Sequence, residues 1–389
     1  MTENKLVRIL KSRLEKARNL IKKYGDLWLV ISSGISDTNI DYLLGLHAHG
    51  LMGALLYEEG LHIFIGRLER SFIGHLEDIL VRESEIHTFY GYDEFEREIK
   101  KILAEYSGRR ILANFSASEL YPHASSLSYA LTKKIMHFAE IYEIELRPAG
   151  RFVYELRQTK TPEELEALRN CVKLTMNIFD SIVNEGVIKP GMTEREIAAK
   201  FYGEIYKIGE PSFDIIVASG PNTANPHHVV SERKLETNDI LYIDFGVRYL
   251  TMCSDITRCL VIGSPSNKIK MTYNAVVEAQ NEAISTIKVG ATFSEPDIAA
   301  RKTFQRHGFD PEKYFIHTLG HALGIDVHDV GPTLSYKVVN KRIPGNVAYT
   351  VEPALYFEKE FGIRLEDDVI VLDSGIERLV KAPEEPIYL

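Results

Sequence analysis

The chain is poor in cysteine and tryptophan. Its 389 residues include three cysteines and one tryptophan. The cysteines, Cys171, Cys253 and Cys259, form no CxxC pair, so neither a zinc knuckle nor a redox-active disulfide is indicated. An odd and sparse set of thiols also argues against the disulfide framework of small secreted proteins. We therefore expect reduced cysteines and a cytoplasmic location.

Long apolar runs and an excess of positive charge are missing as well. No uninterrupted stretch reaches the roughly 18 apolar residues that a membrane-spanning helix needs, so we expect no membrane partner. The formal net charge is -9. Nucleic acid is not expected as a partner either, because phosphate binding needs concentrated positive charge.

The first 25 residues are basic, but they lack the features of a targeting peptide. Glu15 interrupts the positive charge, and no continuous apolar core is present. Leu6, Leu10 and Leu14 recur at helical spacing. This pattern predicts an amphipathic surface helix that ends near Gly25.

The length and an ordinary composition predict two globular domains. The hydrophobic fraction is 45% and the charged fraction 26%. Residues 1–152 alternate between helical and strand patterns, with a strand predicted at 27–32, two short strands within 53–66, a helix at 93–106 and a strand at 109–116. This alternation predicts an α/β domain.

The second predicted domain covers residues 153–389 and contains a strong helix start. Thr161 suits the N-cap, Pro162 the first helical position, and Glu164 the capping box of a long helix. Farther on the chain turns strand-rich, with helices between the strands. Strands are predicted within 213–220, 240–247, 257–263, 347–357 and 363–372, and helices within 267–288 and 295–307. We expect an α+β domain with a mostly antiparallel, curved sheet.

Two pairs of acidic residues stand in these strand patterns, where acids are depleted. A hairpin centred between residues 249 and 250 would place Asp244 directly opposite Asp255. A second hairpin, centred on Lys359, would place Glu352 opposite Glu366. Opposed residues share one face of a sheet, with Cβ atoms about 4.5–5.5 Å apart.

Like charges at such distances repel each other, so the arrangement needs an explanation. Each acid could simply be exposed to solvent. However, a bound cation would remove the repulsion for all four acids at once. Four carboxylates with one imidazole suit two divalent metal ions about 3.5–4 Å apart, which can activate water for hydrolysis.

The segment HTLGHALGIDVHD, residues 317–329, supplies candidate imidazoles. His317 and His321 are four residues apart, which resembles the helical HxxxH zinc motif, but no glutamate follows His317. Gly320 and Gly324 disfavour a helix. We predict a tight, non-helical segment with His321 as the metal ligand and His328 near the substrate.

The ordered set of motifs resembles the pita-bread metallopeptidases, and within them the Xaa-Pro dipeptidases (prolidases) and aminopeptidases P. The similar segments are SGPNTANPHH, LYIDFGVRYLTMCSDITR, HTLGHALGIDVHDVG, TVEPALY and GIRLEDDV, which lie within residues 213–373. The preceding α/β segment resembles the creatinase-like amino-terminal domain of the same proteins. Ala322 and Ala354 depart from the family pattern, which affects substrate detail more than metal binding.

The resemblance implies a role for each matching residue. The five metal ligands would be Asp244, Asp255, His321, Glu352 and Glu366, with Asp255 and Glu366 bridging two metal ions. Mn or Co is expected foremost, with Fe or Zn as alternatives. Glu352 would also carry the proton. His227 and His328 would contact the substrate, whereas His317 and Arg364 would support the site or bind substrate.

The resemblance implies hydrolysis of the bond before proline, most directly in Xaa-Pro dipeptides, by a homodimer. One alternative is aminopeptidase P activity, which releases the first residue of longer Xaa-Pro peptides. Alternatives of another class are a non-catalytic protein-binding module and a metal lyase or hydrolase acting on a non-peptide molecule, because fold alone does not fix function.

Overall fold

The computed structural model describes residues 2–33, 37–46, 50–74, 84–115, 124 and 126–389, and the chain divides into two compact units, Met1–Glu163 and Glu164–Leu389. The predicted domain boundary lies after residue 152. The segment 153–163 groups with the first unit because helix α6 (Gly150–Gln158) packs against helix α1 (Thr2–Ile21). The Lys16 ammonium donates to the carbonyl of Leu156 over 2.7 Å.

A six-stranded sheet forms the centre of the first unit, in the order β4-β3-β2-β1-β5-β6. The strands are β1 (Leu27–Ser33), β2 (Leu51–Leu56), β3 (Leu61–Gly66), β4 (Ser84–Phe89), β5 (Arg110–Ala113) and β6 (Glu145–Pro148). The predicted strands match β1, β2, β3 and β5, although residue 116 of the last prediction lies outside the described part of the chain. Parallel and antiparallel pairs are mixed, so the α/β prediction for this unit is confirmed.

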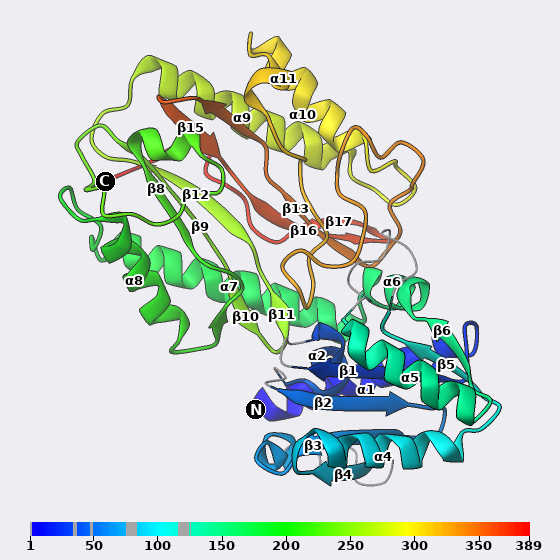
Figure 1. The fold of residues 1–389 in the computed structure, drawn as a ribbon. Helices are drawn as coiled ribbons and strands as arrows, with labels where there is room; N and C mark the ends of the chain where they lie inside the picture. Colours follow the sequence, from blue (N-terminus) through cyan, green and yellow to red (C-terminus); the bar gives the residue numbers. More distant parts are fainter. Residues whose placement is uncertain (1, 34–36, 47–49, 75–83, 116–123, 125) are drawn as a thin grey trace. The chain divides into compact units, whose positions relative to one another are not determined.

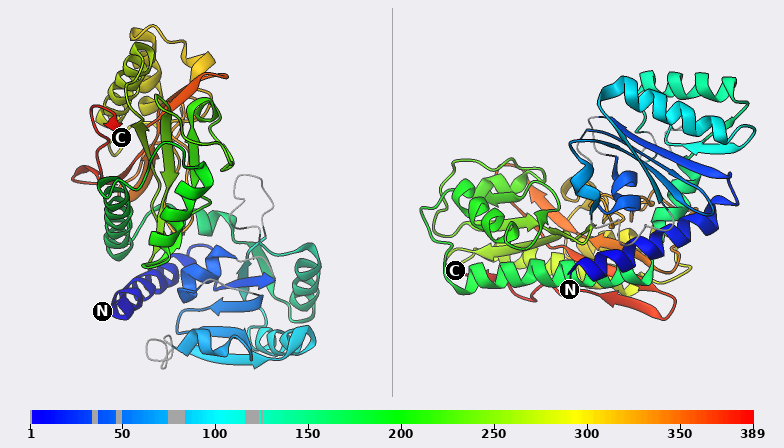
Figure 2. Two further views of the ribbon diagram at one scale, coloured as in Figure 1. Left: turned by 90° about the vertical axis from the view of Figure 1, so that its left-hand side faces the viewer. Right: turned by 90° about the horizontal axis from the view of Figure 1, so that it is seen from below.

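Helices cover both faces of this sheet (Figure 2). Helices α4 (Gly91–Glu105) and α5 (Tyr129–Ile141) lie on one face, where Phe95 and Ile135 pack against strand residues such as Leu29. Helix α1 lies on the other face, as its predicted amphipathic pattern requires. The unit also contains α2 (Thr38–Leu44) and the 3-10 turn η1 (Arg70–Ile73).

The second unit follows the predicted order of helices and strands closely (Figure 1). Its helices are α7 (Pro162–Asn184), α8 (Glu194–Ile205), α9 (Asn267–Thr286), α10 (Glu295–Arg306) and α11 (Pro311–Tyr314), with a 3-10 turn η3 (Gly220–Ala224). Its strands are β7 (Glu210–Pro211), β8 (Ile216–Ser219), β9 (Ile240–Phe245), β10 (Val247–Tyr249), β11 (Met252–Cys253), β12 (Ile256–Val261), β13 (Val347–Val351), β14 (Ala354–Phe357), β15 (Phe361–Arg364), β16 (Asp367–Leu372), β17 (Gly375–Arg378) and β18 (Ile387–Tyr388). The strand pairs are antiparallel except β12 with β18, which confirms the α+β prediction.

Strand β9 shows how this unit buries both sheet faces. Leu241 and Ile243 pack in a core that includes residues of α7 and α8. Tyr242 points the other way, into a core that includes residues of α9 and α10. Because side chains alternate along a strand, Asp244 belongs to the face of Tyr242. Figure 1 shows α9 and α10 on the opposite side of the strands from α7 and α8.

The first predicted hairpin register is wrong, because each residue of β9 pairs with a residue two positions farther along the chain than predicted. The turn falls at Leu250 and Thr251, whose positive φ angles of 51° and 66° suit a two-residue hairpin turn. Asp244 therefore opposes Thr257, and Asp255 lies two residues before Thr257 on the same face. The two aspartates are diagonal neighbours rather than opposed residues.

The second predicted hairpin register is confirmed. Strands β14 and β15 pair as expected around Lys359, and Val351 opposes Asp367 in the adjoining β13–β16 ladder in the same register. Glu352 and Glu366 stand at the break between the two ladders. The two glutamates are therefore not part of either regular ladder, although the same register on both sides keeps them close to each other.

Candidate metal centre

A cavity of about 380 Å³, open to solvent on one side, lies between the two acidic hairpins of the second unit. It brings together all of the residues that the sequence analysis selected: Asp244, Asp255, His321, Glu352, Glu366, His227, His317, His328 and Arg364. They come from parts of the chain more than a hundred residues apart. The fold thus concentrates four carboxylates, four imidazoles and one guanidinium at a single place.

Asp244 reaches the cavity from the end of β9 and is only partly neutralised. Its Oδ2 pairs with Nη2 of Arg364, and its Oδ1 is buried without a hydrogen-bond partner in the structure. A buried carboxylate oxygen that lacks a partner carries a large desolvation cost. This oxygen is therefore available to a cation.

Asp255, His321 and Glu366 each direct one potential ligand atom toward a common point, with those atoms within 4.8 Å of one another. The Nε2 atom of His321 lies 3.4 Å from Oδ2 of Asp255. The opposite ring nitrogen, Nδ1, is 3.2 Å from the carbonyl of Ala322. A proton on Nδ1 satisfies that carbonyl and leaves the Nε2 lone pair facing the carboxylates, which is the tautomer a metal ligand needs.

The segment that carries His321 is not helical, as predicted. Gly320 forms an isolated bridge with Leu334, and the backbone N–H of His321 donates to Oγ1 of Thr350 over 3.1 Å. A Cβ atom on Gly320 would lie 2.0 Å from the carbonyl oxygen of Thr350. Glycine is thus required here for close backbone approach, and that approach holds the imidazole beside the strands.

Glu352 and Glu366 complete the acidic set. Oε1 of Glu352 lies 3.6 Å from Nε2 of His321 and accepts a long hydrogen bond of 3.3 Å from Oγ1 of Thr350. Oε2 of Glu366 accepts a 2.7 Å hydrogen bond from Oγ1 of Thr257. Glu352 is therefore oriented by a threonine two residues before it in the chain, and Glu366 by a threonine of β12, while the other oxygen of each glutamate stays available.

The electrostatics of this set call for positive charge. Burial raises the pKa of Asp255 well above the usual range, and the nearby charge of Glu366 raises it further. Burial likewise raises the pKa of Glu366, and the charge of Glu352 adds to that shift. Burial, and then Asp244, raise the pKa of Glu352 to about 8. Burial lowers the pKa of His321 to about 3 and keeps its imidazole neutral. Crowded carboxylates beside a neutral imidazole fit divalent metal ions.

The remaining histidines surround the acidic set. The ring centroids of His321 and His328 lie 3.9 Å apart, and His227 lines the cavity after Pro226. His317 makes polar contacts on both ring nitrogens, 2.8 Å from the carbonyl of Thr318 and 3.2 Å from the hydroxyl of Tyr356. Those contacts fix the ring of His317.

Arg364 is buried, with 3% of its surface exposed, so its ion pair with Asp244 is not a surface ion pair. Besides Asp244, it donates to the hydroxyl of Tyr356 over 3.0 Å, to Oγ1 of Thr257 over 3.1 Å and to the carbonyl of Pro226 over 3.2 Å. The planar guanidinium distributes these bonds over fixed directions, so it orients several groups of the site at once.

Several residues of the site were missed in the sequence. Thr257 and Tyr356 contact the selected side chains, and Phe213 and Ile216 provide apolar lining. A correct turn assignment would have placed Thr257 opposite Asp244. No sequence signal separated the two apolar residues from those of the core.

A second buried acid, Glu194, was also missed. It is 1% exposed and accepts hydrogen bonds from Ser219, Asn222, His228 and Ser231. Burial opposes the charged form, but these donors outweigh it and lower the pKa of Glu194 to about 2. His228, beside His227 in the sequence, therefore anchors the loop rather than facing the cavity.

Comparison with known sequences agrees with this geometry. Residues 166–373 match the model of metallopeptidase family M24. An uncharacterized peptidase of Bacillus subtilis is 31% identical over 97% of this chain and 100% of its own. An Xaa-Pro dipeptidase of Pyrococcus furiosus is 34% identical over 67% of this chain and 73% of its own.

Solved structures resemble the chain over nearly its whole length. An Xaa-Pro dipeptidase from Bacillus anthracis has a TM-score of 0.81 and 29% identity, covering 98% of this chain and 100% of that one. An X-Pro aminopeptidase from Thermotoga maritima has a TM-score of 0.82 and 28% identity, covering 96% and 99%. These matches confirm the expected pita-bread fold with an amino-terminal domain, and the chain belongs to metallopeptidase family M24.

Proposed function

We propose that this metallopeptidase hydrolyses the peptide bond before proline, with Xaa-Pro dipeptides as its main substrates. The observation that carries the proposal is the cavity in which four carboxylates and a neutral imidazole converge. Relatives with the names Xaa-Pro dipeptidase and X-Pro aminopeptidase support the substrate class. The cavity volume of about 380 Å³ lies at the lower end of the range for small-molecule sites, which favours a short substrate.

In this proposal two divalent metal ions, Mn or Co foremost with Fe or Zn possible, are held by Asp244, Asp255, His321, Glu352 and Glu366. As the family resemblance implies, Asp255 and Glu366 would be the two ligands that both ions share. When bound, such ions supply Lewis acidity, which makes a nucleophile of water near neutral pH. The protein's part is to hold the five ligands in fixed positions, through Arg364 and the threonines that orient them.

The other polar side chains act on the substrate. A carboxylate oxygen of Glu352 accepts the proton of the attacking water and delivers it to the leaving proline nitrogen. The imidazole N–H groups of His227 and His328 donate to the substrate carbonyl oxygen as it gains negative charge. His317 and the hydroxyl of Tyr356 close the wall beside Glu352.

Recognition of proline has to rely on shape. The nitrogen of an Xaa-Pro bond carries no hydrogen, so no backbone donor distinguishes it. The apolar lining residues Phe213, Ile216 and Val327 offer a surface for the pyrrolidine ring. We assign ring recognition to this part of the wall.

The second candidate function is aminopeptidase P activity. A neighbouring cavity of about 720 Å³ shares Phe213, Ile216 and His227 with the first one. It offers space for residues that follow proline in a longer peptide. The X-Pro aminopeptidase of Thermotoga maritima resembles the chain as well as the dipeptidase does.

The test compares three peptides with metal-free protein reloaded with Mn²⁺ or Co²⁺. We expect faster hydrolysis of Ala-Pro than of Ala-Pro-Ala and no hydrolysis of Ala-Ala, which lacks proline. Faster turnover of Ala-Pro-Ala would favour the aminopeptidase. Absence of metal-dependent turnover of any proline peptide would refute both candidates. Cytoplasmic location and a homodimeric state stay predictions from the sequence and the family resemblance.

A further inference from the structure

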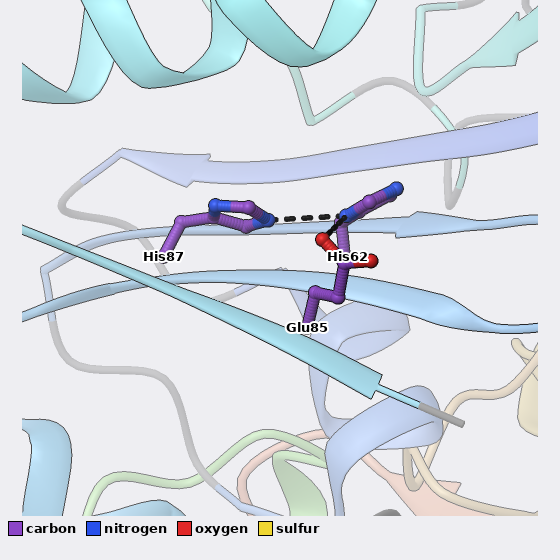
Figure 3. Close-up of side chains that lie close together, drawn as sticks. All are labelled: His62, Glu85 and His87. Carbon is purple, nitrogen blue, oxygen red and sulfur yellow. Dashed lines mark hydrogen bonds and ion pairs between the residues drawn. The ribbon is translucent and has the colours of Figure 1, made fainter. Parts of the chain in front are cut away.

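The first unit contains a separate cluster of potential metal ligands on strands β3 and β4. His62 pairs directly with Glu85 in this parallel ladder, and Phe64 pairs with His87. Because alternate residues of a strand share a face, His62, Glu85 and His87 lie on one side of the sheet. Figure 3 shows the three side chains converging above the two strands.

The three ligand atoms are spaced as a metal site requires. Nδ1 of His62 lies 3.0 Å from Nε2 of His87 and 3.7 Å from Oε2 of Glu85, and one atom from each residue lies within 4.8 Å of the others. Ligand atoms at 2.0–2.1 Å from a tetrahedral zinc ion are separated by about 3.3 Å. The observed separations bracket that value, and the contact to Glu85 is too long for a hydrogen bond.

The outer ring nitrogen of His62 has a hydrogen-bond partner of the kind that accompanies metal-bound histidines, and the outer nitrogen of His87 faces a carboxylate beyond hydrogen-bond distance. Nε2 of His62 lies 2.8 Å from the hydroxyl of Tyr106. Nδ1 of His87 lies 3.9 Å from Oε2 of Glu98 on helix α4. Protons on these outer nitrogens leave both inner nitrogens with a free lone pair. The two inner nitrogens, 3.0 Å apart, form a hydrogen bond when one of them carries a proton. With protons on both outer nitrogens instead, a cation between the inner nitrogens takes the place of that hydrogen bond.

Burial and charge point the same way. His62 is 2% exposed, and the aromatic rings of Tyr57 and Phe64 stack on His62 and His87. Burial lowers the pKa of both histidines, so the imidazoles are neutral near pH 7 and ready to coordinate. The side chain of Glu85 is 66% exposed, which gives the site access to solvent.

We propose that His62, Glu85 and His87 form a zinc site on the first unit, independent of the peptidase centre. The ligands are Nδ1 of His62, Nε2 of His87 and the carboxylate of Glu85, and water completes the tetrahedron from the exposed side. Two imidazoles with one carboxylate suit zinc better than the oxygen-rich set of the second unit does. The ion joins the edge strand β4 to β3 and stabilises this end of the sheet.

The experiment uses the full chain with Asp255→Asn and His321→Ala, so that metal bound at the peptidase centre does not dominate. This parent variant is stripped with a chelator, given Zn²⁺, and passed over a desalting column before metal analysis. We expect one tightly bound zinc. With Co²⁺ in place of Zn²⁺ we expect the visible absorption of a tetrahedral ion.

Further substitutions in the parent separate a metal site from a stacked histidine pair. The side chain of Glu85 is exposed, so its substitution should disturb folding less than substitution of either histidine. Glu85→Gln should weaken zinc binding at least tenfold, and Glu85→His should preserve it. Glu98→Gln, beside the outer nitrogen of His87, should weaken binding by about 10–100-fold. His137→Gln changes an exposed histidine of α5 and serves as the matched control with unchanged binding.

The outcomes are distinct. Absence of bound zinc in the parent variant would overturn the proposal. So would zinc binding that persists unchanged in Glu85→Gln and in a further variant, His87→Gln, which removes a proposed ligand and should also bind zinc more weakly. Equal loss of zinc in His137→Gln would overturn the proposal as well. Circular dichroism of each variant verifies that it is folded, and metal-dependent peptide hydrolysis by the unmutated protein tests the proposed function separately.

Discussion

Two groups of buried carboxylates in the second unit have pKa values shifted in opposite directions. Glu194 receives side-chain and backbone donors on both oxygens, and its pKa falls to about 2. Asp255 and Glu366 are also buried, but they have few donors and lie among other acids, so their pKa values rise far above the usual range. The supply of donors and the presence of neighbouring acids are what differ between the two groups.

The comparison shows how a structural acid is distinguished from a metal ligand. A carboxylate with a full set of donors is stable as an anion and needs no cation. A cluster of carboxylates without donors is destabilised by its own charge, and only a cation or protons can relieve it. We therefore expect the acidic cluster to destabilise the metal-free protein and to stabilise it once metal ions are bound.

The largest expected effect is the loss of catalytic activity caused by the substitution Asp255→Asn. Loss of the proposed bridging carboxylate should lower metal occupancy of the centre and reduce hydrolysis of Ala-Pro on the order of 10³-fold, equivalent to about 4 kcal/mol. Metal analysis and kcat/KM measure the two effects. Asp180→Asn, at an exposed position of α7, is the control. Wild-type metal content in Asp255→Asn would contradict the bridging role.

Glu194→Gln should destabilise the protein in a pH-dependent manner. The folded pKa of about 2 lies below the ordinary 4.5, so the stabilisation is complete above pH 4.5 and disappears as the pH falls toward 2. Its size near pH 7 is about 3 kcal/mol. Urea unfolding followed by circular dichroism, with exposed Glu282→Gln as control, measures it. A difference independent of pH would contradict the role of the charge.

Arg364→Lys should lower kcat more than it changes KM. Lysine keeps the charge but cannot hold Asp244, Tyr356 and Thr257 together with one planar group. The expected loss in kcat is about 10–100-fold, as for residues that orient metal ligands. Arg306→Lys on the surface of α10 provides the control. An effect confined to KM would instead indicate direct substrate binding.

The smallest expected effect is a gain in the stability of the metal-free protein, whereas Glu194→Gln should lower stability. In metal-free protein, Asp255→Asn should raise stability by about 1 kcal/mol or more, because it removes one of several repelling charges. After Mn²⁺ is added, the wild type should become the more stable of the two. Thermal unfolding with and without Mn²⁺ measures both. A metal-free variant less stable than wild type would break the comparison.

The two acidic hairpins show what limits prediction from sequence. The β14–β15 register was predictable because Glu358, Lys359 and Gly362 mark the turn between two apolar runs. The β9–β12 register was missed because the turn uses Leu250 and Thr251 in left-handed conformations, which neither residue favours by itself. Contacts of the surrounding fold impose that turn.

The donors to Glu194 show the same limit. Its position in the first turn of a helix predicts an exposed acid that interacts with the helix dipole. Only the fold brings Ser219 and Ser231 over both of its oxygens. The pairing of His62 with His87 likewise depends on which strands become neighbours, and no local motif announces it.

The sequence by itself predicted the fold class and the order of strands and helices, because periodicity is a local signal. Unusual acids within strands pointed to a metal centre, and the resemblance to a known family supplied the full set of predicted ligands and the predicted roles of the histidines and Arg364. The tertiary structure alone decided which carboxylates have donors, how Asp244 and Asp255 face each other, and that a second histidine cluster exists. Those properties depend on contacts between distant segments, whose distances and burial set the electrostatic energy of each group.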